Sequence, residues 1–189
     1  PAVDRQALDR MPRLRAVLHA AGSVRAFVTD ACWDRGLLVS SAAQANAVPV
    51  AEYTLAAILL AGKRAFRLRE DFNRARGELR TDHLGRIGNH RATVGVIGAS
   101  RVGRRVLELL RPLDLVPLLA DPYLDPAAAT RLGATLMPLD ELLAASDVVT
   151  LHAPQLPETH HMLDRRRLAL IPDGATLINT SRGALVDHE

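Results

Sequence analysis

A glycine-rich turn is the first stretch of this sequence whose residue types could do chemistry. Residues 93–105 read T-V-G-V-I-G-A-S-R-V-G-R-R, an apolar run followed by a turn and a helical pattern. Gly98 would permit a tight turn, Gly103 would permit close helix–strand packing, and free backbone N–H groups at the helix start could receive a pyrophosphate. Ser100 replaces the middle glycine of the G-x-G-x-x-G pattern. It adds a Cβ where the backbone would approach the phosphates, but it also offers a hydroxyl donor. Because glycine turns before helices are common, a plain chain reversal stays an alternative.

An acidic residue follows the next expected strand at a useful distance. Asp121 lies 18 residues after Gly103 (121 − 103), close to the spacing of an acid that binds the adenosine ribose. A carboxylate there would accept hydrogen bonds from both ribose hydroxyls and repel a 2′-phosphate. The alternative is a turn-forming aspartate, because Pro122 follows it.

The composition excludes several classes of function. Aromatic residues make up 3% of the chain and the net charge is +3, so a nucleic-acid surface is not expected. Cys32 is the only cysteine, which excludes an intrachain disulfide or thiolate cluster. A single cysteine also fits a location in the reducing cytoplasm. The sequence shows neither a leader nor a run of about 18 apolar residues, so neither export nor a membrane span is expected. The start at Pro1 without methionine suggests a truncated or processed chain.

The hydrophobic pattern predicts alternating strands and helices. Repeated β–α units of this kind build a parallel sheet with right-handed crossovers, a doubly wound, Rossmann-type α/β fold. Ligands of such sheets gather at the carboxyl ends of the strands, where Gly98, Asp121, residues 152–154 and residues 179–182 all fall. Strands are predicted at 14–19, 37–39, 94–97, 115–120, 134–137, 148–151 and 175–178, and helices at 29–35, 46–66, from 102, from 126, at 138–144 and at 164–170.

Three other segments carry expectations of their own. The helix expected at 46–66 has an apolar stripe so wide that it must be buried between domains or between subunits. The charged and glycine-containing stretch 67–91 is expected to be a connecting excursion. Arg165, Arg166 and Arg167 form the one dense basic run, which is expected to be a solvated helix face.

Several motifs, in order, resemble the D-isomer-specific 2-hydroxyacid dehydrogenase family. They are N-A-V-P-V-A-E at 46–52, G-V-I-G-A-S-R-V-G at 95–103, D-P-Y at 121–123, S-D-V-V-T-L-H-A-P at 146–154, P-E-T at 157–159 and I-N-T-S-R-G-A-L-V-D at 178–187. The match covers nearly the whole chain from Pro12. It implies a partial, flavodoxin-like substrate domain over residues 1–45 and an NAD-binding Rossmann domain over residues 46–189, incomplete at its C-terminal end.

The resemblance also implies an activity and roles for individual residues. It implies an oxidoreductase that transfers hydride between NAD(H) and a 2-keto or 2-hydroxy acid, with Arg182 as the catalytic arginine and no metal. The alternative for Arg182 is a surface arginine after a strand. The helix at 46–66 would serve homodimerisation. Beside Gly98, Ser100, Gly103 and Asp121, the implied cofactor residues are Arg101, Val102, Ala153, Pro154, Thr180 and Ser181, and the implied substrate-binding residues are Ala21, Gly22 and Ser23.

Two departures from the family pattern shape these expectations. Arg25 stands where an acidic residue is usual. The family's catalytic glutamate and histidine lie beyond the 178–187 motif, and this chain ends at Glu189. His152 is interpreted as structural, and His160, His161 and His188 as solvent or packing residues. We therefore expect cofactor binding without turnover by this chain. A non-catalytic, corepressor-like NAD-binding regulator on the same fold is the alternative function.

Overall fold

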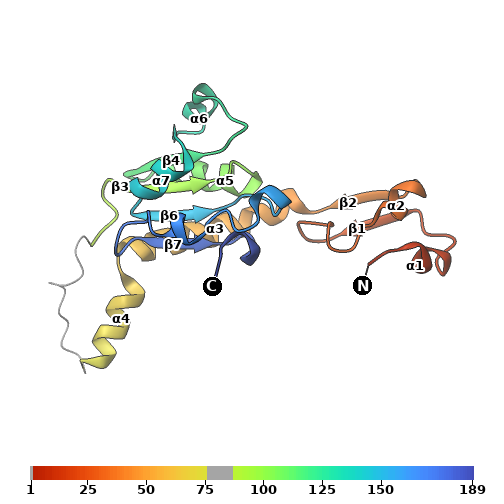
Figure 1. Ribbon diagram of the computed structural model, residues 1–189, viewed down its shortest axis with the longest axis horizontal. Coiled ribbons are helices and arrows are strands. Elements are labelled where there is room, and N and C mark those ends of the chain that lie inside the picture. Colours follow the sequence, from red (N-terminus) through yellow and green to blue (C-terminus); the bar gives the residue numbers. More distant parts are fainter. Residues whose placement is uncertain (1, 76–86) are drawn as a thin grey trace. The chain divides into compact units, whose positions relative to one another are not determined.

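The computed structural model describes residues 2–75 and 87–189, and these form two compact units (Figure 1). Unit 1 covers residues 1–48 and unit 2 covers residues 49–189. The division lies inside one helix, α3 (Ala43–Gly62), as does the domain boundary expected after residue 45.

Unit 1 is built on a pair of parallel strands. Strand β1 (Ala16–His19) pairs in parallel with β2 (Leu38–Ser41). The helices α1 (Arg5–Asp9) and α2 (Asp30–Asp34) complete the unit. Leu8, Cys32 and Leu37 form its small buried core.

Unit 2 contains a five-stranded parallel sheet in the order β5-β4-β3-β6-β7. The chain leaves the central strand β3, fills one side of the sheet with β4 and β5, and then crosses to β6 and β7 on the other side. The strand order therefore reverses between β3 and β6, and a crevice at the carboxyl ends of these strands is the usual ligand site of such sheets. The strand bounds are Ala92–Ile97 for β3, Leu115–Ala120 for β4, Thr135–Leu136 for β5, Val148–Leu151 for β6 and Thr176–Asn179 for β7.

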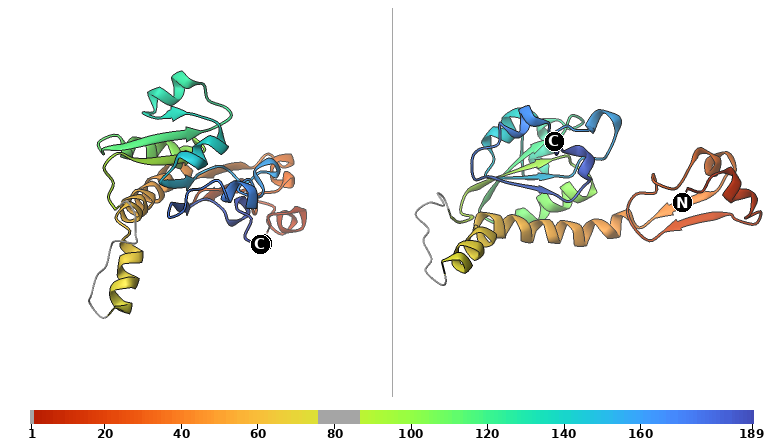
Figure 2. Two further views of the ribbon diagram at one scale, coloured as in Figure 1. Left: turned by 60° about the vertical axis from the view of Figure 1, so that its left-hand side comes forward. Right: turned by 60° about the horizontal axis from the view of Figure 1, so that its bottom comes forward.

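Helices cover both faces of this sheet (Figure 2). Alternate strand residues such as Val96 and Ile97 belong to different clusters, because successive side chains of a strand point to opposite faces. Helices α3, α5 (Arg101–Leu110) and α6 (Pro126–Arg131) contribute to one cluster, and α7 (Leu139–Ala145) and α8 (Arg165–Leu168) to the other. Two short 3₁₀ turns, η1 (Pro157–Thr159) and η2 (Gly183–Leu185), complete the described elements of the unit together with α4 (Ala65–Arg74). The expected doubly wound parallel sheet is confirmed.

The long apolar helix begins and ends at residues other than those expected from the sequence, which were 46 and 66. It begins at Ala43 and ends at Gly62, because Arg64 takes a left-handed backbone conformation (φ 53°) that breaks the helix. A separate helix, α4, then runs from Ala65 to Arg74. The expectation of a connecting excursion over 67–91 is therefore wrong for its first part, and residues 76–86 lie outside the described residues.

Helix α3 buries one face and exposes another. Ala47, Ala51, Thr54, Ile58 and Ala61 are buried and recur at spacings of three and four residues, as one face of a helix requires. By length and composition alone α3 could cross a membrane, a test that core helices of soluble proteins also pass.

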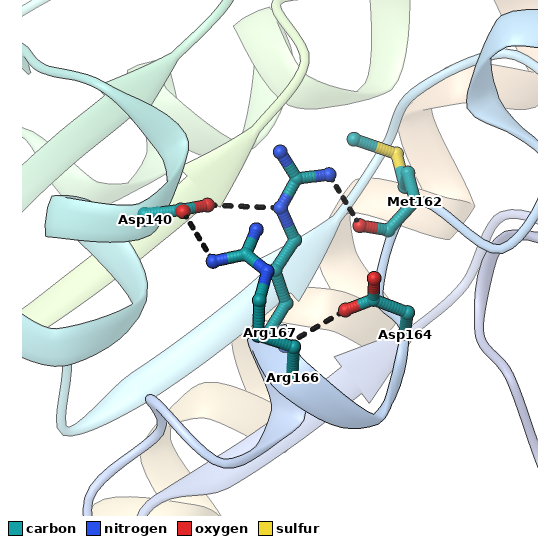
Figure 3. A network of polar contacts seen from close by, with 5 residues as sticks. All are labelled: Asp140, Met162, Asp164, Arg166 and Arg167. Carbon is teal, nitrogen blue, oxygen red and sulfur yellow. Dashed lines mark hydrogen bonds and ion pairs between the residues drawn. The ribbon is translucent and has the colours of Figure 1, made fainter.

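The basic run at 165–167 does more than face solvent (Figure 3). Arg166 and Arg167 each place a guanidinium nitrogen 2.8 Å from a different carboxylate oxygen of Asp140. Arg167 also donates to the carbonyl oxygen of Met162 at 2.8 Å. These contacts join α7 to α8. Arg165 and Arg166 are exposed, as expected of a solvated helix face, whereas Arg167 is partly buried. The paired guanidinium groups hold the pKa of Asp140 below its usual value.

Candidate functional site at the carboxyl edge of the sheet

The glycine turn after β3 depends on the absence of two side chains. Gly98 has a positive φ of 90°, and a Cβ there would lie 2.9 Å from the backbone nitrogen of Ala153. A Cβ on Gly103 would lie 2.0 Å from the carbonyl oxygen of Gly98. Only glycine at both positions lets the first turn of α5 rest directly on the end of β3.

Helix α5 begins with unpaired backbone donors. Ser100 is its N-cap residue, and its hydroxyl oxygen accepts the N–H of Gly103 at 3.4 Å. Within the part of the chain that the structure describes, the backbone N–H groups of Arg101 and Val102 meet no protein acceptor. Unpaired N–H groups and the positive end of the helix dipole together favour an anion such as a pyrophosphate.

Asp121 connects the end of β4 to this turn. One carboxylate oxygen accepts the backbone N–H of Ala99 at 2.7 Å, and the other accepts the N–H of Tyr123 at 2.9 Å. The turn-forming role that the sequence left open is therefore present. Each carboxylate oxygen keeps a second lone pair, so ribose binding stays compatible with these bonds.

A second side chain bonds to the next peptide group of the same turn. The Nε atom of Arg104 donates to the carbonyl oxygen of Ala99 at 2.8 Å. Asp121 and Arg104 thus engage both polar groups of Ala99, and they hold the glycine turn in one conformation.

The loop after β7 is tied down by its own side chains. The Asn179 side chain accepts the N–H of Ser181 and donates to the carbonyl oxygen of Arg182, both at 2.9 Å. The Ser181 hydroxyl donates to the carbonyl oxygen of Ala153 at 2.7 Å. Arg182 itself is exposed and donates to the adjacent Ser181 carbonyl oxygen at 2.8 Å. Its guanidinium pairs with no carboxylate among residues 2–75 and 87–189.

His152 lies at the end of β6 and is 4% exposed. Its Nε2 atom lies 2.9 Å from the hydroxyl of Thr150, and its Nδ1 atom lies 3.5 Å from the hydroxyl of Thr180. Burial lowers the pKa of His152 from 6.5 to about 4, because an imidazolium loses its hydration there. His152 is therefore a neutral, hydrogen-bonded imidazole at neutral pH.

The other predicted residues fall into two groups. Ala153 is buried beside Gly98, and Pro154 is exposed next to it. Ala21, Gly22 and Ser23 follow β1 in unit 1, where Ala21 and Ser23 are exposed. The remaining predicted cofactor and catalytic residues all belong to unit 2.

The remaining histidines of the sequence analysis are exposed. The rings of His160 and His161 stack with centroids 3.9 Å apart, and Nε2 of His188 lies 3.3 Å from the carbonyl oxygen of Gly183. Among the described residues, no group of three or more His, Cys, Asp or Glu side chains could hold a metal ion.

Sequence reasoning gave no structural role to four residues that organise this edge, although it placed Asn179 there. Arg104 and Asn179 hold the two loops, while Thr54 bonds the partly buried Thr180 side chain and Thr150 bonds the buried His152 side chain. The sequence pattern could have indicated Thr54, because it is the one polar residue on the buried face of α3. The other three depend on contacts that only the folded sheet creates.

The burial of His152 predicts a loss of stability in mild acid. In the unfolded chain the imidazole binds a proton below a pH of about 6.5, whereas in the folded protein it stays neutral down to a pH of about 4. The free energy of unfolding should therefore fall as the pH decreases through this window, by at most about 3 kcal/mol. Urea unfolding of the wild type and of His152→Gln, which cannot titrate, measures this. A difference between the two proteins that stays constant across the window would contradict it.

Comparison with known proteins places this geometry in a family. Residues 55–189 match the model of the D-isomer specific 2-hydroxyacid dehydrogenase, NAD binding domain. A D-3-phosphoglycerate dehydrogenase of Mycobacterium tuberculosis is 34% identical over 98% of this chain, which covers 35% of that protein. A D-lactate dehydrogenase of Aquifex aeolicus, solved with NAD and lactic acid, is 34% identical with a TM-score of 0.74, over 97% of this chain and 55% of that one. A D-lactate dehydrogenase of Treponema pallidum is 28% identical with a TM-score of 0.81, over 99% and 56%.

The chain therefore spans about a third of the length of the curated relatives and about half of the solved chains. The family model covers most of unit 2, including the glycine turn, Asp121 and the loop that carries Arg182. The two glycines and the unpaired N–H groups fit the cofactor that this model names. The chain belongs to the D-isomer-specific 2-hydroxyacid dehydrogenase family and carries its NAD-binding domain.

Proposed function

We propose that this protein serves an NAD-dependent dehydrogenase reaction on a small 2-keto or 2-hydroxy acid. The observation that carries the proposal is the glycine turn, where Gly98 and Gly103 let the start of α5 pack directly on the end of β3, beside the unpaired N–H groups of Arg101 and Val102. The relatives named D-3-phosphoglycerate dehydrogenase and the neighbour solved with NAD and lactic acid support the reaction class.

In this proposal, different residues of unit 2 bind the pyrophosphate, the ribose and the nicotinamide of NAD. Arg101 and Val102 would hold the pyrophosphate through their backbone N–H groups, with Ser100 capping the same helix end. Asp121 would accept the ribose hydroxyls. Thr180 and Ser181, with Ala153 and Pro154 on the neighbouring strand end, would line the nicotinamide site.

Arg182 is the residue of this chain that we assign to the substrate. Its exposed guanidinium has no carboxylate partner among the described residues, so a substrate carboxylate can bind it in a two-pronged fork. The same positive charge would polarise the keto oxygen of the substrate. NAD, when bound, supplies the hydride chemistry. Ala21, Gly22 and Ser23 are proposed to offer backbone N–H groups to the carboxylate.

We also propose that the protein acts in the cytoplasm as a homodimer that pairs through α3. The helix presents large apolar side chains to solvent: Val48 is 40%, Tyr53 69% and Leu60 42% exposed. An exposed apolar face of this kind is typical of a protein interface.

The dimer proposal predicts a concentration-dependent mass. Sedimentation equilibrium of the wild type at micromolar concentrations should give twice the chain mass, and Leu60→Asp should give the monomer because it places a charge in the apolar interface. Tyr123→Asp is the matched control, since Tyr123 is 83% exposed and lies outside α3. A monomeric wild type, or dissociation caused equally by the control, would contradict the proposal.

The cofactor assignment predicts a preference for NADH over NADPH. Asp121 repels a 2′-phosphate, and its hydrogen bonds to ribose should make NADH bind about 10- to 100-fold more tightly. Calorimetric titration of the wild type and of Asp121→Asn tests this. The variant keeps one carbonyl oxygen as an acceptor, loses the negative charge and should lose most of the preference. Equal or tighter binding of NADPH by the wild type would show that Asp121 does not bind ribose.

A further inference from the structure

A continuous chain of polar groups runs through the core of unit 2. The Thr54 hydroxyl on α3 donates to the carbonyl oxygen of Val50 at 2.8 Å and lies 3.2 Å from the Thr180 hydroxyl. The Thr180 hydroxyl lies 3.5 Å from Nδ1 of His152, whose Nε2 lies 2.9 Å from the Thr150 hydroxyl. Thr54, Thr150 and His152 are all buried. The chain therefore links α3 to the ends of two neighbouring strands.

The number of available protons fixes the direction of every link. A carbonyl oxygen only accepts, so the single proton of Thr54 goes to Val50. The bond between the two threonines must then use the proton of Thr180. Because that proton is spent, Nδ1 of His152 must be the donor to Thr180, and Nε2 must accept from Thr150. The network thus requires the neutral tautomer of His152 that carries its proton on Nδ1.

This chain ends in the loop that carries the proposed catalytic residue. Thr180 lies between Asn179 and Ser181, whose polar groups already bond to each other and to the carbonyl oxygens of Ala153 and Arg182. The Thr180 side chain bonds to the buried side chains of Thr54 and His152. His152, its partner, also lies beside the cofactor turn, since a Cβ added to Gly103 would lie 3.4 Å from the Cβ of His152.

We propose that Thr54 is a positioning residue that acts through Thr180. Through the hydrogen-bonded chain to His152, Thr54 and Thr180 hold the loop 179–182 against the glycine turn and so set the nicotinamide and substrate sites at one fixed geometry. This inference rests on the proposed function of the same edge. It adds that a hydroxyl on α3, which would touch neither cofactor nor substrate, controls cofactor binding by ordering the Thr180 side chain.

The test replaces Thr54 with valine, which removes the side-chain hydroxyl and keeps the shape of the side chain. Thr54→Val should weaken NADH binding about 3- to 10-fold by calorimetry, and Thr54→Ser, which keeps the hydroxyl, should restore it. Thr130→Val is the matched control, because the Thr130 hydroxyl makes the same kind of bond to the carbonyl four residues before it, at 2.9 Å to Pro126. Equal affinity of Thr54→Val and wild type would overturn the proposal, as would an equal loss in the control.

The tautomer of His152 can be measured by NMR in the absence of the cofactor, and it reports on the hydrogen-bond network directly. Nitrogen-15 chemical shifts of His152 in the wild type should show the proton on Nδ1. In Thr54→Val the Thr180 proton is released and can be donated to Nδ1, so the Nε2-protonated tautomer should become populated. A wild type with the proton on Nε2 would overturn the proposal, even where the variant does not fold.

The two measurements separate this proposal from the proposed function. A wild type that shows the Nδ1 tautomer and binds no NADH would refute the proposed function while the buried network stands. A wild type that binds NADH with the proton of His152 on Nε2 would refute the positioning role alone.

Discussion

The contact between the start of α5 and the end of β3 is the constraint on which the rest of unit 2 depends. The carbonyl oxygen of Gly98 occupies space that any Cβ on Gly103 would need, with a separation of only 2.0 Å. This approach directs the unpaired N–H groups of the helix to the sheet edge and brings Gly98 against Ala153. A larger residue at either position would separate helix, turn and the end of β6 together.

Two polar systems support that contact from different sides. Asp121 and Arg104 bond to the backbone N–H and carbonyl oxygen of Ala99 in the turn. The threonine–histidine chain holds the loop after β7 from inside the core. An unpaired polar group costs more in an apolar interior than in water, so the buried system must keep every bond or lose the geometry of the loop. The site is therefore positioned by core hydrogen bonds as much as by the strands themselves.

The sequence was sufficient to predict the parts of the site that local patterns encode. Strand, turn and helix around Gly98 follow from periodicity and glycine spacing, and the same reasoning placed Asp121 at the end of its strand. Contacts between distant residues were not predictable in this way. Arg166 and Arg167 meet Asp140 across more than 25 positions of the chain, and Thr54 meets Thr180 across 126. The break at Arg64 was missed because a left-handed arginine carries no sequence signal comparable to a glycine or proline.

The unpaired N–H groups at the start of α5 are proposed to receive the pyrophosphate of NAD. Amide NMR of the isotope-labelled chain, titrated with NADH, tests it most directly because each backbone N–H reports separately. The amides of Arg101 and Val102 should shift downfield as they form bonds to phosphate oxygens, with smaller changes around Asp121 and Thr180. Saturating NADH that leaves the Arg101 and Val102 amides unmoved, while amides elsewhere shift, would contradict it.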